Sequence, residues 1–219
     1  MPIRCRCVAI AVFDTDTIKI MPIKNTFEKA IEKSSVYSVG SNKVDLDYIK
    51  SQEYKEKFNA ISENEELNRS IYSRCKAALI NESGNYYEDL SILDSKGNLI
   101  GSSVSKIKNE TLYTPKIVEA IEKHREYSLV AVHNHATNLP PSGSDLTSAG
   151  YRKYNFGVVA CHNGKLFVYS VKKARPFTLS YIEKLVAKYV ASKYNRYEAM
   201  VKALEQAEKD FGVEWREIK

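Results

Sequence analysis

His133 and His135 lie two residues apart at the end of an apolar run, and Asp145 follows after a short loop. Residues 127–132 are short, apolar and rich in valine, which predicts a buried strand. Alternate side chains of a strand point to the same face, so both imidazoles should face the same way. With Asp145 they would give a divalent metal three ligands and leave one position open, as in a catalytic zinc site. The pattern therefore predicts metal-dependent hydrolysis.

Each part of this cluster also has an ordinary structural explanation. A histidine at a strand end is most often a hydrogen-bonded structural residue, and Ser142-x-x-Asp145 before a helix has the pattern of a capping box. The combination favours a metal. The chain has four histidines, and two of them end its most apolar strand, where burying polar side chains is costly unless a partner offsets the cost.

The segments before the histidines predict helices and then a hairpin. Apolar residues at helical spacing follow Asp45 and Asn64, which are suitable N-caps for two helices over 45–61 and 64–79. Further towards the N-terminus, short strands are expected at 3–13 and 17–23, and a helix at about 27–33. After the two helices, the expected hairpin has strands within 86–94 and 98–104 and a turn at 95–97, in which Gly97 can adopt a positive φ.

The segments around and after the histidines predict two helices and a second hairpin. Thr114 and Pro115 fit the N-cap and first position of a helix over 114–124. A helix is expected from Ser142 to about Arg152. Two strands should follow, FGVVAC and KLFVYSV, joined by a turn at 162–164.

The last forty residues carry one continuous apolar stripe at helical spacing. It predicts a single long helix that reaches Phe211 and stops at Gly212. Such a helix exceeds the usual length in globular proteins, so part of it is expected to pack on another subunit or domain.

Composition fits a globular protein in a reducing compartment. The 219 residues are 43% hydrophobic and 27% charged, with no apolar run long enough for a membrane span. The start of the chain lacks the features of a signal peptide, and four cysteines do not form a disulfide framework. We therefore expect a cytoplasmic location and no membrane partner. A net charge of +6 permits weak attraction to nucleic acid and does not require it, and without a basic arm or zinc-finger spacing we do not expect a nucleic-acid partner.

His-x-His, a proline-containing loop and Ser-x-x-Asp together resemble the motif of the JAMM (MPN-plus) metalloproteases. The resemblance covers residues 84–175 and looks most like the branch found in phage and other mobile elements. It implies an α/β fold of the αβα sandwich type, with a curved, mixed and mostly antiparallel sheet. Around this core at 84–175 we expect an N-terminal β/α appendage at 1–44, a helical lead-in at 45–83 and the long C-terminal helix at 176–219.

The resemblance also implies the chemistry of the site. His133, His135 and Asp145 would bind Zn²⁺, and Ser142 would help stabilise the oxyanion. Glu88 is expected as general base, with Glu82 as the alternative. The substrate would be a protein, for example a ubiquitin-like or a capsid protein.

Two positions depart from the family pattern. Ala136 stands where a proline is usual, and the loop from Ala136 to Ser144 is one residue shorter than usual. The alternative to an enzyme is a non-catalytic scaffold of the same fold, of the kind used in phage head assembly. In that case the chain would be virion-associated or part of a larger assembly, joined through its C-terminal helix.

Overall fold

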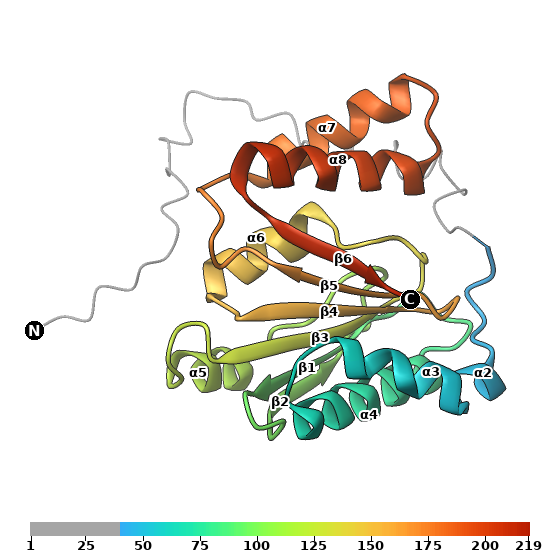
Figure 1. Ribbon diagram of the computed structural model, residues 1–219, viewed down its shortest axis with the longest axis vertical. Coiled ribbons are helices and arrows are strands. Elements are labelled where there is room, and N and C mark those ends of the chain that lie inside the picture. The colour runs from blue at the N-terminus through green and yellow to red at the C-terminus, as the bar shows by residue number, and fades with distance from the viewer. Residues whose placement is uncertain (1–39) are drawn as a thin grey trace, which may run out of the picture. The chain divides into compact units, whose positions relative to one another are not determined.

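The computed structural model describes residues 40–219, which belong to one compact unit (Figure 1). The expected strands at 3–13 and 17–23 and the helix near 27–33 lie outside the described residues, together with Cys5 and Cys7.

A six-stranded sheet runs through the middle of this unit in the order β2-β1-β3-β4-β5-β6. All neighbouring strands are antiparallel except β3 and β4, which are parallel. The predicted mixed, mostly antiparallel sheet is therefore confirmed. The strands are β1 (Asp89–Asp94), β2 (Leu99–Val104), β3 (Leu129–His135), β4 (Phe156–Cys161), β5 (Leu166–Ser170) and β6 (Glu214–Ile218).

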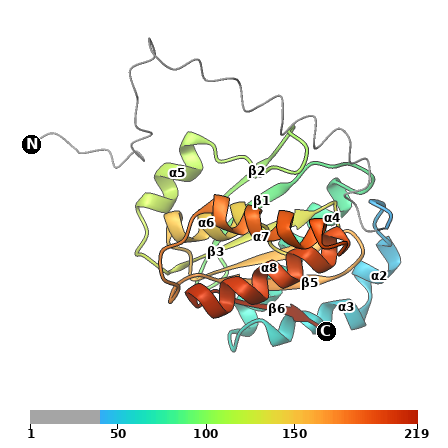
Figure 2. The same cartoon turned by 90° about the horizontal axis from the view of Figure 1, so that it is seen from above.

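Helices cover both faces of the sheet, which makes the predicted three-layer arrangement (Figures 1 and 2). One face carries the first helices of the described chain: α2 (Leu46–Lys50), α3 (Gln52–Lys57), the 3₁₀ turn η1 (Phe58–Ala60) and α4 (Glu65–Asn81). The other face carries the later helices: α5 (Pro115–Glu122), α6 (Gly143–Arg152), α7 (Leu179–Ala191) and α8 (Arg196–Phe211).

The expected caps and turns are confirmed. The side chains of Asp45, Asn64, Thr114 and Ser142 accept hydrogen bonds from the first backbone N–H groups of α2, α4, α5 and α6. Gly97 adopts a positive φ of 88° in the turn between β1 and β2. Local capping and turn chemistry therefore fixes the boundaries of these elements.

Strand β3 is buried along its whole length and divides its side chains between two cores. Leu129 and Ala131 pack on the side of α5 and α6, whereas Val130 and Val132 pack on the side of α4. Because side chains alternate along a strand, the histidines at 133 and 135 belong to the α6 side.

The prediction of one long helix over 176–219 is wrong. The chain forms α7, reverses at residues 192–195, returns as α8 and ends in β6, which pairs antiparallel with β5. At the reversal Lys193 has a positive φ of 68°, and Asn195 forms a capping box with Glu198. Both helices bury an apolar face, so the periodicity of the sequence continues through the reversal. The predicted stop at Gly212 is confirmed by its left-handed conformation.

The packing of α7 against α8 removes the reason, based on the sequence, for expecting the C-terminal region to dock on another subunit or domain. The apolar stripe that motivated docking on another subunit is covered largely within the chain, where α7 and α8 lie side by side and α7 packs on α6 (Figure 2). In β6, Trp215 lies opposite Tyr169 of β5 and packs against the core on the α8 side.

Replacing Gly157 by alanine tests the packing of β4 on β5. A Cβ at Gly157 would overlap the ring of Tyr169, its partner in register, and overpacking of this kind costs about 1–3 kcal/mol. Gly150→Ala on α6 is the matched control, because its Cβ would meet nothing closer than 3.5 Å, and alanine gains about 0.5–1 kcal/mol over glycine in a helix. Chemical denaturation should show the two variants moving in opposite directions. Equal free energies of unfolding would contradict this account of the packing.

Candidate metal centre

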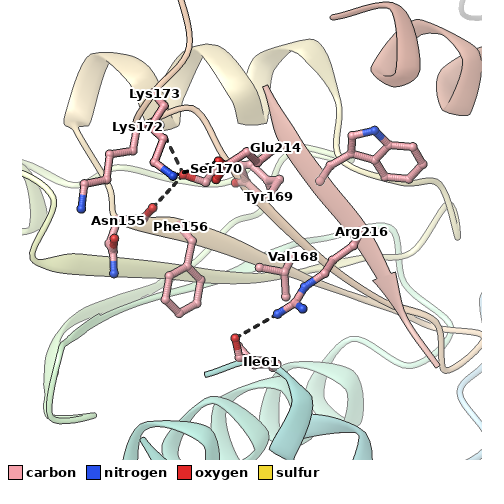
Figure 3. Close-up of a pocket in the computed structure, with 11 residues that line it drawn as sticks. Ile61, Asn155, Phe156, Val168, Tyr169, Ser170, Lys172, Lys173, Glu214 and Arg216 are labelled. Atoms are coloured by element: carbon pink, nitrogen blue, oxygen red, sulfur yellow. Dashed lines mark hydrogen bonds and ion pairs between the residues drawn. The ribbon is translucent and has the colours of Figure 1, made fainter. Parts of the chain in front are cut away.

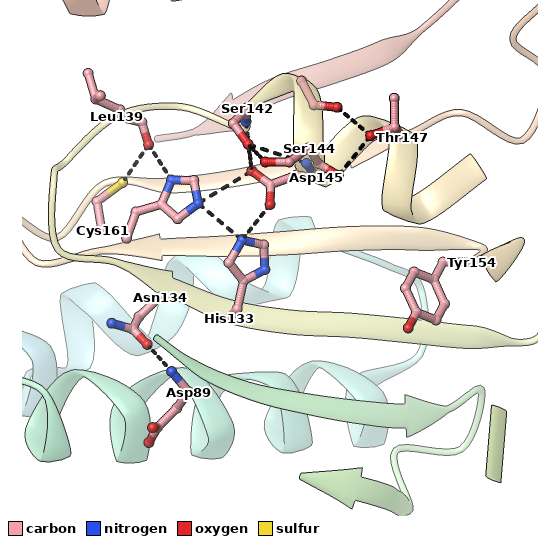
Figure 4. A network of polar contacts seen from close by, with 12 residues as sticks. Asp89, His133, Asn134, Leu139, Ser142, Ser144, Asp145, Thr147, Tyr154 and Cys161 are labelled. Atoms are coloured by element: carbon pink, nitrogen blue, oxygen red, sulfur yellow. Dashed lines mark hydrogen bonds and ion pairs between the residues drawn. The ribbon is translucent and has the colours of Figure 1, made fainter. Parts of the chain in front are cut away.

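The end of β3 brings two imidazoles together. His133 and His135 lie on the same face of the strand, and their Nε2 atoms lie 3.1 Å apart. Figure 4 shows His133 turned toward Asp145. Both side chains are buried, with 3% and 5% of their surface exposed. Two ring nitrogens this close, turned toward each other and away from water, need a cation or a proton between them.

Asp145 supplies the third group from the first turn of α6. Its Oδ1 lies 3.2 Å from His133 Nε2, and its Oδ2 lies 3.4 Å from His135 Nε2. Ligands held 2.0–2.1 Å from a tetrahedral zinc ion are about 3.3 Å apart. The separations of 3.1 Å between the two Nε2 atoms and 3.2 Å from His133 to Oδ1 fit pairs of ligands of a four-coordinate metal, and the 3.4 Å separation from His135 is to the other carboxylate oxygen. The structure brings the three predicted ligands together.

A capping box holds Asp145 in place. The backbone N–H and the hydroxyl of Ser142 both donate to Asp145 Oδ2 at 2.7 Å, while the Asp145 N–H donates back to Ser142 Oγ at 3.3 Å. The ordinary explanation of Ser-x-x-Asp as a helix cap is thus confirmed. It is compatible with metal binding, because Oδ2 is held by Ser142 while Oδ1 faces His133.

The loop between β3 and α6 fixes the orientation of the second histidine. His135 Nδ1 lies 2.9 Å from the backbone oxygen of Leu139. A carbonyl oxygen can only accept, so Nδ1 carries the proton and the lone pair of the neutral ring lies on Nε2, toward Asp145. Cys161 Sγ donates to the same oxygen at 3.4 Å. With Ala136 and one residue fewer than the family pattern, this loop still brings the Asp145 carboxylate to the two imidazoles.

Charge inside the cluster shifts the pKa values of its members. Burial alone would raise the pKa of Asp145, but the two histidines outweigh it and hold this pKa well below its usual range. Burial alone would lower the pKa of His135, but the hydrogen bond and charge of Asp145 outweigh it and raise the pKa to about 9. Without a metal, a proton on His135 therefore balances the aspartate at neutral pH.

Glu88 reaches the same cluster from the residue just before β1. A carboxylate oxygen of Glu88 and a ring nitrogen of each histidine all lie within 4.8 Å of one another. The glutamate is 6% exposed. Burial raises the pKa of Glu88, the histidines lower it, and the net shift is upward. A buried carboxyl with a raised pKa beside a metal site is suited to accept and return a proton.

Glu82, the alternative base, lies elsewhere. It is the C-cap residue of α4, and the groups that shift its pKa are Asp89, Lys106 and Asn85, after burial itself. No contact with either histidine is found for Glu82 among the described residues. Of the two candidate glutamates, the structure brings only Glu88 to the cluster.

Cys161 and His162 are adjacent in the chain and make hydrogen bonds that hold neighbouring backbone. The Cys161 side chain is buried and bonded to Leu139, and His162 Nδ1 lies 2.6 Å from the backbone oxygen of Asn42. Neither the Leu139 carbonyl nor Asn134, which lies between the two histidines, is indicated by the sequence pattern. The alternation of β3 could have placed Asn134 on the opposite face.

A pocket of about 410 Å³ lies at the edge of the sheet formed by β4, β5 and β6 (Figure 3). Its lining includes Phe156, Val168 and Arg216, and the Arg216 guanidinium donates to the backbone oxygens of Ala60 and Ile61. None of its lining residues belongs to the histidine cluster. We therefore assign the candidate chemistry to the cluster, where groups with shifted pKa values converge, rather than to this pocket.

Comparison with protein-family models, curated proteins and solved structures finds no match for this chain. Within the described residues, no helix is both long enough and apolar enough to cross a membrane.

Metal binding should release a proton. Because the pKa of His135 is raised to about 9, the ring is protonated at pH 7 and must lose that proton before Nε2 can bind a metal. Zinc titrations by calorimetry in buffers of different ionisation enthalpy should show release of at least about one proton per ion at pH 7, the proton that His135 must lose. A heat independent of the buffer at pH 7 would contradict the assigned charge state.

Proposed function

We propose that this chain is a zinc-dependent metalloprotease of the JAMM type, which hydrolyses an amide or isopeptide bond in a protein substrate. The observation that carries the proposal is the triangle of two Nε2 atoms and one carboxylate with separations of 3.1–3.4 Å, beside the buried Glu88. The resemblance of His133-x-His135 and Ser142-x-x-Asp145 to that family's motif supports the same assignment.

Each residue of the site has a separate proposed role in hydrolysis. His133, His135 and Asp145 would hold the zinc ion, which supplies Lewis acidity and lowers the pKa of a water toward ~7. Glu88 accepts a proton from the attacking water and returns it to the leaving amine, a role that suits its burial and raised pKa. The hydroxyl of Ser142 turns from Asp145 Oδ2 to donate to the developing oxyanion.

The substrate class follows from the same resemblance. The proposed substrates are ubiquitin-like or capsid proteins, and the reaction would take place in the cytoplasm of a bacterium or an infected host. Purified protein should contain about one zinc per chain by mass spectrometry and should cleave a ubiquitin-like fusion. A protein without zinc and without peptidase activity would instead favour a scaffold in an assembly.

Glu88→Gln should separate metal binding from turnover. The variant keeps all three proposed ligands and should keep its zinc, but a general base contributes about 10²–10⁴ in rate. Cleavage of the fusion should fall by that factor. Glu82→Gln is the matched control, because it removes a buried carboxylate that does not face the histidines.

The reverse pattern, with Glu82→Gln inactive and Glu88→Gln active, would refute the assignment of the base. His133→Ala completes the set, because removing a proposed ligand should abolish zinc binding. An unchanged zinc content in that variant would refute the proposed centre.

Ser142→Ala tests whether Ser142 does more than cap α6. Loss of an N-cap typically costs about 1 kcal/mol of stability, whereas loss of an oxyanion donor costs about 10²–10³ in rate. Asn195→Ala removes the N-cap of the other capping box, at the start of α8, and should cost similar stability with no loss of turnover. Equal activity of the two variants would leave Ser142 with its capping role alone.

A further inference from the structure

Asn134 lies between the two histidines and points to the opposite side of β3. The residue is fully buried, with 0% exposed. Its Oδ1 accepts a hydrogen bond from the Asp89 backbone N–H at 2.8 Å, and its Nδ2 donates to the Tyr87 backbone oxygen at 3.1 Å. Figure 4 shows the bond to Asp89. One side-chain amide therefore binds the backbone on both sides of Glu88.

The orientation of this amide is determined by its partners. A backbone N–H can only donate and a carbonyl can only accept, so the oxygen of Asn134 must face Asp89 and its nitrogen must face Tyr87. The nitrogen also lies 3.0 Å from His162 Nε2. His162 thus accepts at Nε2 from Asn134 and donates from Nδ1 to the backbone oxygen of Asn42. With these bonds, both hydrogens and the oxygen of the Asn134 amide have partners.

The backbone at Glu88 needs such support because the β1–β3 pairing stops short of it. The last paired residues in this direction are Leu90 and His133. Beyond them, Asp89 bonds to the side chain of Asn134. On the other side, the Glu88 carbonyl accepts from the Ser105 N–H at 3.2 Å. The segment that carries Glu88 is therefore held toward β3 by the amide of Asn134.

We propose that Asn134 is a positioning residue, which fixes the backbone of residues 87–89 so that the Glu88 carboxylate faces His133 and His135. This inference rests on the proposed function. It links the alternation of β3 to the chemistry. The odd positions provide metal ligands on the α6 side, and the even position holds the proposed base from the α4 side. Without Asn134, Glu88 would keep its chemistry and lose its fixed place beside the metal.

The test uses the cobalt-loaded protein, because its visible absorption reports the ionisation state around the metal without any substrate. Glu88→Gln removes a negative charge near the ion and should lower the pH midpoint of the absorption change by about one unit. Asn134→Ala should lower the pH midpoint by at least half as much as Glu88→Gln does, while its affinity for cobalt stays within about threefold of that of the parent. Asn68→Ala is the matched control, because Asn68 on α4 is also a buried amide, and its Nδ2 donates to the backbone oxygens of Asn59 and Ser62 rather than to residues 87–89.

The outcomes distinguish the two proposals. If Glu88→Gln shifts the midpoint but Asn134→Ala has the same midpoint as the parent and as Asn68→Ala, the positioning role is wrong and the proposed function stands. If cobalt does not bind, or if Glu88→Gln has no effect, the proposed function fails and the inference fails with it. If Asn134→Ala does not fold, Asn134→Ser replaces it, because serine keeps a polar group at this buried position. With an active substrate, kcat should fall in the Asn134 variant at unchanged KM.

Discussion

The ion pair between Asp145 and two buried imidazoles is the interaction around which the described structure is organised. Isolated charges are costly to bury, so each of these groups depends on the others. Asp145 stays ionised because His133 and His135 face it, and His135 gains its raised pKa of about 9 largely from Asp145. A cation is held in this position in either state, a proton in the free protein and a metal in the proposed enzyme.

The topology explains how residues from β3 and α6 meet. β3 and β4 are parallel, so the chain must cross from one end of the sheet to the other between them, and α6 makes that crossing. A crossover helix starts close to the end of the strand that precedes it. Its first turn therefore returns to the carboxyl end of β3, where both histidines lie, and ligand sites in α/β sheets are typically found at such ends.

Much of the fold and the candidate site could be predicted because their signals are local. Caps at Asn64 and Ser142, the turn at Gly97 and the spacing of the histidines all depend on neighbours within a few residues. The reversal between α7 and α8 could not be found from periodicity, since both helices bury apolar faces. β6 is short and half-exposed, and only its pairing with β5 makes it a strand. The roles of Leu139 and Asn134 depend on backbone groups brought close by folding, which side-chain patterns do not encode.

The final strand has a further consequence for how copies of this chain behave at high concentration. β6 forms one border of the sheet, and an unpaired border can recruit a strand from another molecule. Glu214 and Arg216 are exposed on this strand, and charged side chains on edge strands are one of the features by which proteins limit such pairing. The C-terminal segment therefore both completes the sheet of the described residues and places charged side chains along that border.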